Sequence, residues 1–329
     1  MLAENKVKII GVMTSGGDAP GMNAAIRAVV YEGIRHGLKV LGIRRGYSGL
    51  LQEDIREMDE KSVADIIRLG GTVLETSRCP EMMTDEGQAK AAEVCRKYKM
   101  DGLIVIGGDG SFRGAQKLSA KGMGIIGVPG TIDGDIACTD YTIGFDTAVN
   151  AAMEAIDRIH DTGASHECCS IVEVMGRHNG SIALWTGIAG GAEMVCIPER
   201  RVPTADEIAE DVRNKRRQGR NDYILVNAEG VGHTQELRQE MEEDTGIHTR
   251  QTVLGFLQRG GVPTCKERVF ASVMGTKAVD LLLEGRTNRV VVHRDGRFSD
   301  VSIDEVLSQE VYFADDLYQC MKAVCGRKD

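Results

Sequence analysis

Acidic side chains set among glycines recur at two points in the sequence. Asp109 lies in the segment GGDGS at 107–111, and Asp133 and Asp135 lie in TIDGD at 131–135. Two carboxylates two residues apart after an apolar strand point to similar sides of an extended loop. Their proximity favours one of them as a base of raised pKa, or both as a metal clamp. A carboxylate among glycines suits Mg²⁺ held against phosphates that lie over bare backbone.

Each acidic segment also has a simpler interpretation. Asp109 could cap the N-terminus of the helix that follows it, which is a common role for aspartate. The segment at 131–135 could be a solvated acidic turn. The residues alone leave these alternatives open.

A third segment, TSGGDAPGMN at 14–23, is rich in glycine and follows an apolar run. Glycine lets the backbone approach a phosphate closely, and the helix that follows offers unpaired N–H groups and a positive dipole end. The segment is not a Walker loop, because Gly17 stands where the lysine of that motif would be. A tight strand-to-helix turn without a ligand is the alternative.

Arginines in loop contexts supply the opposite charge. Arg177 follows Gly176 after an apolar run, and Arg78, Arg250 and Arg259 also lie in loop-like segments. Each alone is more often a surface arginine. Together with the acidic segments they indicate phosphoryl transfer, in which carboxylates hold a metal, a base activates the acceptor and guanidinium groups stabilise the transferred charge.

Strand-like and helix-like patterns alternate along the chain and position these loops. A parallel sheet covered by helices on both faces is therefore predicted, with ligands at the carboxyl ends of its strands. Ser62 and Asp65 resemble a capping box ahead of a short helix. The predicted strands are 7–13, 38–43, 103–106, 124–128, 170–174, 193–197 and 223–227, and the predicted helices are 22–36, 205–217 and 269–283.

Composition narrows the class of protein. The 329 residues carry 40 Lys plus Arg against 49 Asp plus Glu, a net charge of -9 that disfavours a generally basic nucleic-acid binder. Nine cysteines form no C-x-x-C pair, so free thiols in a reducing compartment are expected. No apolar run approaches the about 18 residues of a membrane span, and no secretion signal is recognised. A cytoplasmic protein with no membrane partner is expected.

Taken together and in this order, the loop motifs closely resemble the bacterial ATP-dependent 6-phosphofructokinase family. The motifs are TSGGDAPGMNAAIR, GGDGS, PGTID, DYTIGF, EVMGR and QRGG, and the resemblance covers nearly the whole chain. It implies a kinase that uses Mg²⁺ to transfer a phosphoryl group from ATP to the 1-hydroxyl of fructose 6-phosphate.

The resemblance also assigns residues. It implies Asp133 as the base, Asp109 as the Mg²⁺ ligand with Asp135 close by, and Arg78, Arg177 and Thr131 as further catalytic residues. On the nucleotide side it implies Gly17, Tyr47, Arg78, Cys79, Gly108, Asp109, Gly110, Ser111 and Gly114. On the sugar-phosphate side it implies Thr131, Asp133, Cys168, Met175, Gly176, Arg177, Glu229, Arg250, Phe256 and Arg259.

The implied architecture is α/β, with two Rossmann-like three-layer αβα domains, mainly parallel sheets and the active site between them. Residues 1–144 and 258–308 would form a larger nucleotide-binding domain. Residues 145–257 and 309–329 would form a smaller domain for the sugar phosphate. Arg250 reaches a neighbouring subunit in the family, which implies a homotetramer with shared active sites.

Family members that use pyrophosphate typically carry Asp in place of Gly110 and Lys in place of Gly130. Both positions are Gly here, which favours ATP as the donor. Three other positions depart from the family pattern: Gly134 replaces a usual Asn, Cys168 a usual Arg and Phe256 a usual His. The last two remove polar contacts to the sugar phosphate.

The departures leave several functions open. The chain could bind fructose 6-phosphate weakly, or it could phosphorylate a different sugar or sugar phosphate. A pyrophosphate-dependent kinase is a further possibility, as is a non-catalytic, nucleotide-binding regulatory paralogue.

Overall fold

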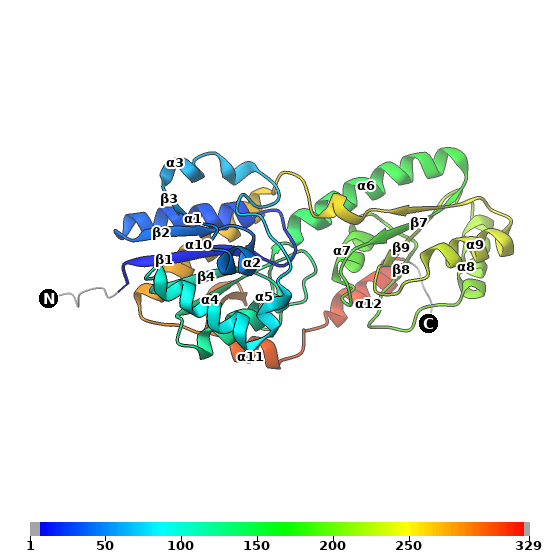
Figure 1. Ribbon diagram of the computed structural model, residues 1–329. Helices are drawn as coiled ribbons and strands as arrows, with labels where there is room; N and C mark the ends of the chain where they lie inside the picture. The colour runs from blue at the N-terminus through cyan, green and yellow to red at the C-terminus, as the bar shows by residue number, and fades with distance from the viewer. Residues whose placement is uncertain (1–6, 326–329) are drawn as a thin grey trace. The chain divides into compact units, whose positions relative to one another are not determined.

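The computed structural model describes residues 7–325, which form two compact units (Figure 1). The large unit contains residues 7–147 and 259–312, and the small unit contains residues 148–258 and 313–325. The chain thus enters the small unit within one helix and returns to the large unit after Gln258. None of the helices in the described part of the chain is both long and apolar enough to cross a membrane. All nine cysteines are free thiols, as predicted.

The large unit is built on a mainly parallel sheet. Its strand order is β12-β11-β5-β4-β1-β2-β3, with β6 paired to β5, and only the two edge pairings are antiparallel. The strands are β1 (Ile9–Ser15), β2 (Lys39–Ile43), β3 (Ile55–Met58), β4 (Gly102–Gly107), β5 (Ile125–Thr131), β6 (Ile143–Gly144), β11 (Arg289–Arg294) and β12 (Arg297–Ser302).

Helices pack against this sheet in two groups. In one group α1 packs against α10 and α3, and in the other α4 packs against α2 and α5, which also contacts α11 (Figure 1). The bounds are α1 (Met22–Arg35), α2 (Gly46–Leu51), α3 (Glu60–Val63), η1 (Ile66–Arg68), η2 (Pro80–Met83), α4 (Asp85–Lys97), α5 (Asp109–Ala120), α10 (Cys265–Leu283) and α11 (Ile303–Ser308).

The small unit has a wholly parallel four-stranded sheet in the order β10-β7-β9-β8. Cys169 and Ile171 of β7 pack with Ile208 of α8 and Met241 of α9 in one buried cluster. The elements are β7 (Cys169–Val174), β8 (Met194–Cys196), β9 (Tyr223–Ala228), β10 (Thr249–Val253), α7 (Ser181–Ala189), α8 (Ala205–Arg217), α9 (Thr234–Thr245), η3 (Gly255–Gln258) and α12 (Asp315–Val324). Helix α6 (Phe145–His166) starts in the large unit and continues into the small one.

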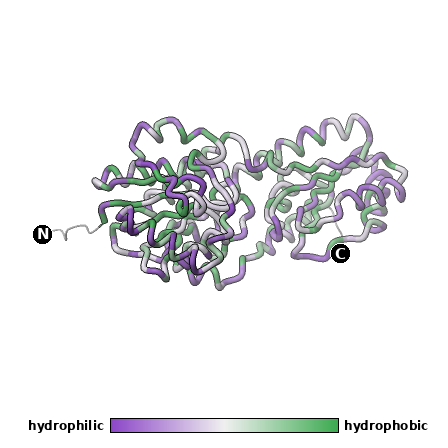
Figure 2. Tube along the Cα trace, viewed as in Figure 1, coloured by the Kyte–Doolittle hydropathy of each residue, from purple (hydrophilic) through white to green (hydrophobic). Residues whose placement is uncertain are grey.

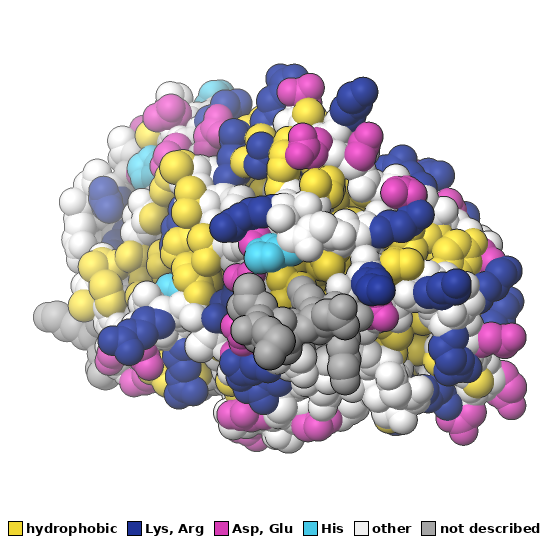
Figure 3. Space-filling model, turned by 90° about the vertical axis from the view of Figure 1, so that its left-hand side faces the viewer, with side chains coloured by type: hydrophobic (Ala, Val, Ile, Leu, Met, Phe, Trp, Pro, Cys, Tyr) yellow, Lys and Arg dark blue, Asp and Glu magenta, His cyan; other side chains and the backbone are white. Residues whose placement is uncertain are grey.

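Burial of apolar strand residues stabilises the fold of both units. Every residue of β4 and β9 is buried, as expected for strands covered by helices on both faces. Figure 2 shows hydrophobic residues along much of the strands in each unit. On the face drawn in Figure 3, basic and acidic side chains are interspersed, so that face offers no broad basic surface to a nucleic acid. The predicted α/β fold with mainly parallel sheets is confirmed.

One local prediction is wrong. Ser62 does not cap a helix: Asp59 caps α3, accepting a hydrogen bond from the Ser62 amide, while the Ser62 side chain accepts one from the Asp59 amide. The capping box is present but begins three residues earlier than predicted. The residues after Asp65 form only the short η1 turn.

The contact between α1 and α10 depends on a glycine. A Cβ at Gly275 would lie 2.6 Å from the carbonyl oxygen of Ala25 and 2.9 Å from the Ala28 Cβ, so the two backbones approach closely only without that side chain. We expect Gly275→Ala to lower the free energy of unfolding by about 1–3 kcal/mol, because the helices must separate.

Gly163→Ala is the matched control for this substitution. Gly163 is also a buried helical glycine, but the nearest atom to its added Cβ would be 3.9 Å away. We expect this change to stabilise the protein by up to about 1 kcal/mol through helix propensity. Equal effects of the two substitutions in urea unfolding would contradict the close-packing explanation.

Candidate active site

The strand order of the large sheet brings two glycine-rich loops together. The strand order reverses at β1. From β1 the chain continues to β2 and β3 on one flank of β1, and then to β4 and β5 on the other flank. Ser15 at the end of β1 is in register with Gly107 at the end of β4. Ligands of parallel α/β sheets bind at such a reversal of strand order. The structure therefore places the segments after Ser15 and after Gly107 side by side at the expected edge.

The loop after β1 uses glycine where the backbone requires it. Gly16 and Gly21 have φ angles of 88° and 100°, and Gly21 begins α1 without a side-chain cap. The amides of the first turn are therefore not taken by a capping side chain, which suits an anion. A Cβ at Gly17 would lie 3.0 Å from a guanidinium nitrogen of Arg259.

Arg259 is itself fixed in this loop. Its guanidinium forms an ion pair with Asp18. The family resemblance implies Arg259 as a sugar-phosphate residue and gives Asp18 no role, although Asp18 belongs to the motif at 14–23. The structure thus adds Asp18 to the site as the residue that orients Arg259 beside Gly17.

The turn between β4 and α5 is open at its centre. Gly108 precedes the helix without a side-chain cap, so the alternative that Asp109 is the N-cap is wrong: Asp109 is the first helical residue. A Cβ at Gly110 would have no neighbour within 4 Å. The Ser111 hydroxyl is buried and has no hydrogen-bond partner among the described residues. A buried hydroxyl is normally satisfied, so Ser111 is available to a ligand.

Tyr47 joins α2 to this same turn. The buried phenol donates a hydrogen bond to the Ser111 carbonyl oxygen at 2.7 Å, and burial raises the pKa of Tyr47 well above its usual range. A Cβ at Gly114 would lie 2.8 Å from the Tyr47 ring, so the ring rests directly on the backbone of α5. Tyr47 and Gly114 therefore hold the helix start in place.

The loop after β5 carries Asp133. Gly107 is in register with Pro129, and a Cβ at Gly108 would lie 3.7 Å from the Cβ of Thr131, so the Asp109 and Asp133 loops are neighbours. The Asp133 amide donates to the Thr131 hydroxyl at 3.2 Å, and that hydroxyl lies 3.5 Å from the Asp135 carboxylate. Asp133 is buried, with 5% of its surface exposed.

Gly134 explains one departure from the family pattern. Its φ angle is 66°, in the left-handed region that glycine and asparagine both accept. The usual asparagine and the glycine of this chain therefore support the same loop conformation between the two carboxylates.

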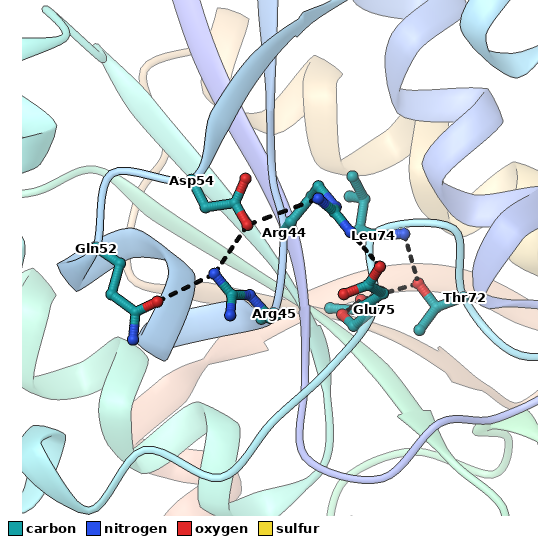
Figure 4. A network of polar contacts seen from close by, with 8 residues as sticks. Arg44, Arg45, Gln52, Asp54, Thr72, Leu74 and Glu75 are labelled. Carbon is teal, nitrogen blue, oxygen red and sulfur yellow. Dashed lines mark hydrogen bonds and ion pairs between the residues drawn. The ribbon is translucent and has the colours of Figure 1, made fainter.

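Arg78 follows a corner held by the polar network in Figure 4. Arg44 forms ion pairs with Glu75 and Asp54, and Arg45 donates to the Asp54 carboxylate at 3.0 Å. Glu75 and Arg45 both have left-handed backbones, with φ angles of 55° and 57°. The network fixes a corner that the backbone alone would disfavour.

Two hydroxyl groups next to Arg78 in the sequence fix the backbone that leads to it. Thr76 donates to the Gly16 carbonyl oxygen at 2.7 Å, and Ser77 donates to the Arg45 carbonyl oxygen at 3.0 Å. The exposed Arg78 side chain thus starts from a backbone attached to the loop after β1. Cys79 follows at the start of η2, and burial raises the pKa of its thiol. Nothing in the sequence patterns had indicated the roles of Thr76 and Ser77.

In the small unit one carboxylate organises the loop after β7. Glu229 accepts hydrogen bonds from the amides of Gly176 at 3.1 Å and Arg177 at 2.7 Å. Arg177 has a left-handed backbone with a φ angle of 54°, which needs outside support, whereas Gly176 accepts its φ angle of 136° because it is glycine. The Met175 amide donates to the side chain of Gln258 at 3.2 Å. The carboxyl edge of this sheet therefore presents an ordered, cation-bearing loop.

Two other predicted residues lie at the opposite edge of that sheet. Cys168 precedes β7, and Arg250 is the second residue of β10, in register with Ser170. The six residues of β7 separate this amino edge from Met175 by about 20 Å at the usual rise per residue. Cys168 is 3% exposed, whereas Phe256 in η3 is 75% exposed. A single small unit cannot present both edges to one phosphate.

Comparison with known proteins shows which family this chain is similar to. The family model described as Phosphofructokinase matches residues 9–282. A curated protein named ATP-dependent 6-phosphofructokinase from Clostridium botulinum (strain Hall) is 53% identical over 95% of this chain and 98% of its own length. One of the same name from Clostridioides difficile (strain 630) is 53% identical over 96% and 99%.

A solved structure is also similar to this chain. The structure titled phosphofructokinase from Saccharomyces cerevisiae superposes with a TM-score of 0.86 at 34% identity, covering 97% of this chain and 48% of the yeast chain. This chain thus spans about half the length of the yeast chain. The fold is α/β, with glycine-rich loops where the strand order reverses. The chain belongs to the phosphofructokinase family.

The role of Glu229 as a backbone acceptor can be tested without an activity assay. Glu229→Ala removes the acceptor of two turn amides, so we expect hydrogen exchange at Gly176 and Arg177 to accelerate at least tenfold, as loss of a charged acceptor worth about 1.5–3 kcal/mol implies. Glu229→Gln keeps a carbonyl acceptor and should accelerate exchange much less. Unchanged exchange in the alanine variant would rule out this role.

Proposed function

We propose that this protein is an ATP-dependent 6-phosphofructokinase, which transfers the terminal phosphoryl group of ATP to the 1-hydroxyl of fructose 6-phosphate, giving fructose 1,6-bisphosphate and ADP, a step of glycolysis. The observation that carries the proposal is 53% identity over almost the whole length of relatives with that name. The neighbouring loops of β1, β4 and β5, which carry the glycines and carboxylates described above, support it. The free thiols and acidic composition fit action in the cytoplasm.

The nucleotide side of the proposal rests on the loops after β1 and β4. Bare backbone at Gly17, Gly108 and Gly110 would receive the phosphates, and the open space at Gly110 leaves room for the α-phosphate of ATP. The unpartnered Ser111 hydroxyl would donate to a phosphate oxygen. The other nucleotide-side residues are Tyr47, Gly114, Arg78 and Cys79, which border the same loops.

Asp109 fits the role of a Mg²⁺ ligand. Its carboxylate oxygens are hard donors, its side chain is 41% exposed, and it has an exposed partner, Arg113, at 3.0 Å. Mg²⁺ in kinases is commonly held by one or two carboxylates together with substrate phosphates, so one such side chain suffices. When bound, Mg²⁺ neutralises charge that develops on the phosphoryl oxygens.

Asp133 is proposed as the general base. The C1 hydroxyl of the sugar gives its proton to the Asp133 carboxylate while its oxygen bonds to the γ-phosphorus, and the bond from that phosphorus to the bridging oxygen of ADP breaks. Thr131 holds the loop through the Asp133 amide, and Asp135 lies beside it. Arg78 and Arg177 are proposed to stabilise the charge of the transferring group.

The sugar phosphate would engage residues of both sheet edges described above. Met175, Gly176, Arg177 and Glu229 lie at the carboxyl edge, and Cys168 and Arg250 lie at the amino edge. Because one small unit cannot offer both edges to one ligand, we propose a homotetramer in which Arg250 completes the site of a neighbouring subunit. Thr131, Phe256 and Arg259 are the remaining proposed contacts.

Affinity for the acceptor is proposed to differ from that of family members with the usual residues. Cys168 and Phe256 cannot supply the charged contacts of Arg and His, each worth about 1.5–3 kcal/mol. Weaker binding of fructose 6-phosphate, or preference for another sugar phosphate, follows. A panel of sugars and sugar phosphates with ATP and Mg²⁺ tests the proposed function, and failure of every acceptor would overturn it.

Removing the base should abolish turnover but spare the nucleotide. We expect Asp133→Asn to lower kcat by about 10²–10⁴, the usual contribution of a general base, with little change in ATP binding. Equilibrium binding of ATP and the melting temperature show whether the variant is folded. Retained kcat would contradict the role of Asp133, and absence of turnover in the unmodified protein would favour the non-catalytic paralogue.

The donor preference should depend on Gly110. An aspartate there would fill the open space and oppose the α-phosphate by charge, so we expect Gly110→Asp to raise KM for ATP at least tenfold. Gly110→Ala adds a methyl group without charge and should have a smaller effect. Steady-state assays with ATP and with pyrophosphate measure both. A protein that uses pyrophosphate better than ATP would contradict the proposed donor.

Restoring a polar group at position 256 should improve acceptor binding. Phe256 is largely exposed, so Phe256→His should fold normally and lower KM for fructose 6-phosphate about tenfold or more, leaving kcat little changed. Phe256→Leu is the control that removes the ring without adding a polar group. An unchanged KM in the histidine variant would exclude this position as the cause of weak binding.

A further inference from the structure

Three potential metal ligands meet in the large unit outside the loops of the active site. Glu32 and His36 are four residues apart at the end of α1, and Asp280 lies on α10. One donor atom from each lies within 4.8 Å of the other two. Glu32 is buried, whereas His36 and Asp280 both reach solvent, so the group is open to an ion from outside.

The packing of the two helices brings these side chains together. Residues four apart on a helix lie on the same face, so Glu32 and His36 present their donors one above the other. The close approach of Gly275 to Ala25 fixes α10 against α1, and Asp280 follows Gly275 by more than one turn. The third ligand therefore comes from a rigid neighbouring element rather than from a mobile loop.

The charges of the group are not balanced internally. The His36 ring nitrogen lies 2.9 Å from a Glu32 oxygen, and Arg35 donates to the same carboxylate at 3.2 and 3.3 Å. Asp280 forms no side-chain hydrogen bond or ion pair of its own within residues 7–325. The group thus places two carboxylates beside one guanidinium and one imidazole.

We propose that Glu32, His36 and Asp280 form a binding site for a divalent transition metal ion of the zinc class, which joins the end of α1 to α10. An imidazole nitrogen and two carboxylate oxygens, with water as the fourth ligand, match the donor types that Zn²⁺ and Co²⁺ accept. Magnesium is disfavoured because it prefers oxygen ligands alone.

The required movement is small. Donor atoms about 2.0–2.2 Å from one tetrahedral ion lie about 3.3–3.6 Å apart. The Glu32 and His36 donors, now 2.9 Å apart, must therefore separate by about 0.5 Å, and the Asp280 donor, which lies within 4.8 Å of both, must come to that spacing. His36 is the exposed residue that ends α1, and its ring has room to rotate. Metal binding would replace the hydrogen bond between His36 and Glu32 by two bonds to the ion.

Cobalt binding to the untagged protein, without nucleotide or Mg²⁺, tests the site. Tetrahedral Co²⁺ with nitrogen and oxygen ligands absorbs visible light, and thiolate ligation adds a near-ultraviolet charge-transfer band that identifies binding to cysteines instead. We expect one Co²⁺ per chain without the thiolate band, competition by Zn²⁺, and a melting temperature that rises with Co²⁺ concentration.

Variants assign the ligands. His36→Ala and Asp280→Asn should each weaken Co²⁺ binding more than tenfold. His248→Ala is the matched control, because His248 also lies beside a glutamate, Glu242 at 3.0 Å, but in a group with no third ligand among the described residues. Melting temperatures without metal show whether each variant folds.

Three results would overturn the proposal. They are no stoichiometric binding, binding that His36→Ala and His248→Ala leave equally strong, and binding that depends on His36 but not on Asp280. The activity proposed above plays no part in this test, so neither result decides the other.

Discussion

The parallel pairing of β1, β4 and β5 is the constraint on which the candidate site depends. Because the three strands run in the same direction with their ends in register, the loops after Ser15, Gly107 and Thr131 emerge at one edge. Register between neighbouring strands leaves little freedom in where a loop begins. Glycine backbone, a solvent-accessible carboxylate and a buried carboxylate thereby become neighbours although the sequence separates them by up to about 120 residues.

Polar contacts then fix the backbone conformation of these neighbouring loops. Tyr47 rests on α5 and bonds to the Ser111 carbonyl oxygen, and Thr76 bonds to the Gly16 carbonyl oxygen. In the small unit Glu229 performs a similar task for two amides. The Glu229 contact holds Arg177 in a left-handed backbone conformation that costs on the order of 1–3 kcal/mol, as is common at functional sites.

Much of this arrangement could be predicted from the sequence, since apolar runs followed by glycine are strong local signals. Helix α8 occupies the predicted residues, and its buried residues Ile208, Ala209 and Val212 follow the helical period. The edge strands β3 and β12 were not predicted, because they are half-exposed and polar and their pairing is with distant segments. The pairing of Asp18 with Arg259 spans 241 residues and depends on tertiary structure. The separation of Cys168 from Met175, by contrast, follows from the strand predicted at 170–174.

The most direct test is a crystal structure of the protein with Mg²⁺ and a non-hydrolysable ATP analogue. The expected result is a triphosphate lying over Gly17 and Gly108–Ser111, a metal bound through Asp109 and the phosphates, and the Asp133 carboxylate facing the γ-phosphate. A nucleotide bound elsewhere, or a γ-phosphate on the far side of the sheet from Asp133, would contradict the arrangement of the three loops as a phosphoryl-transfer site.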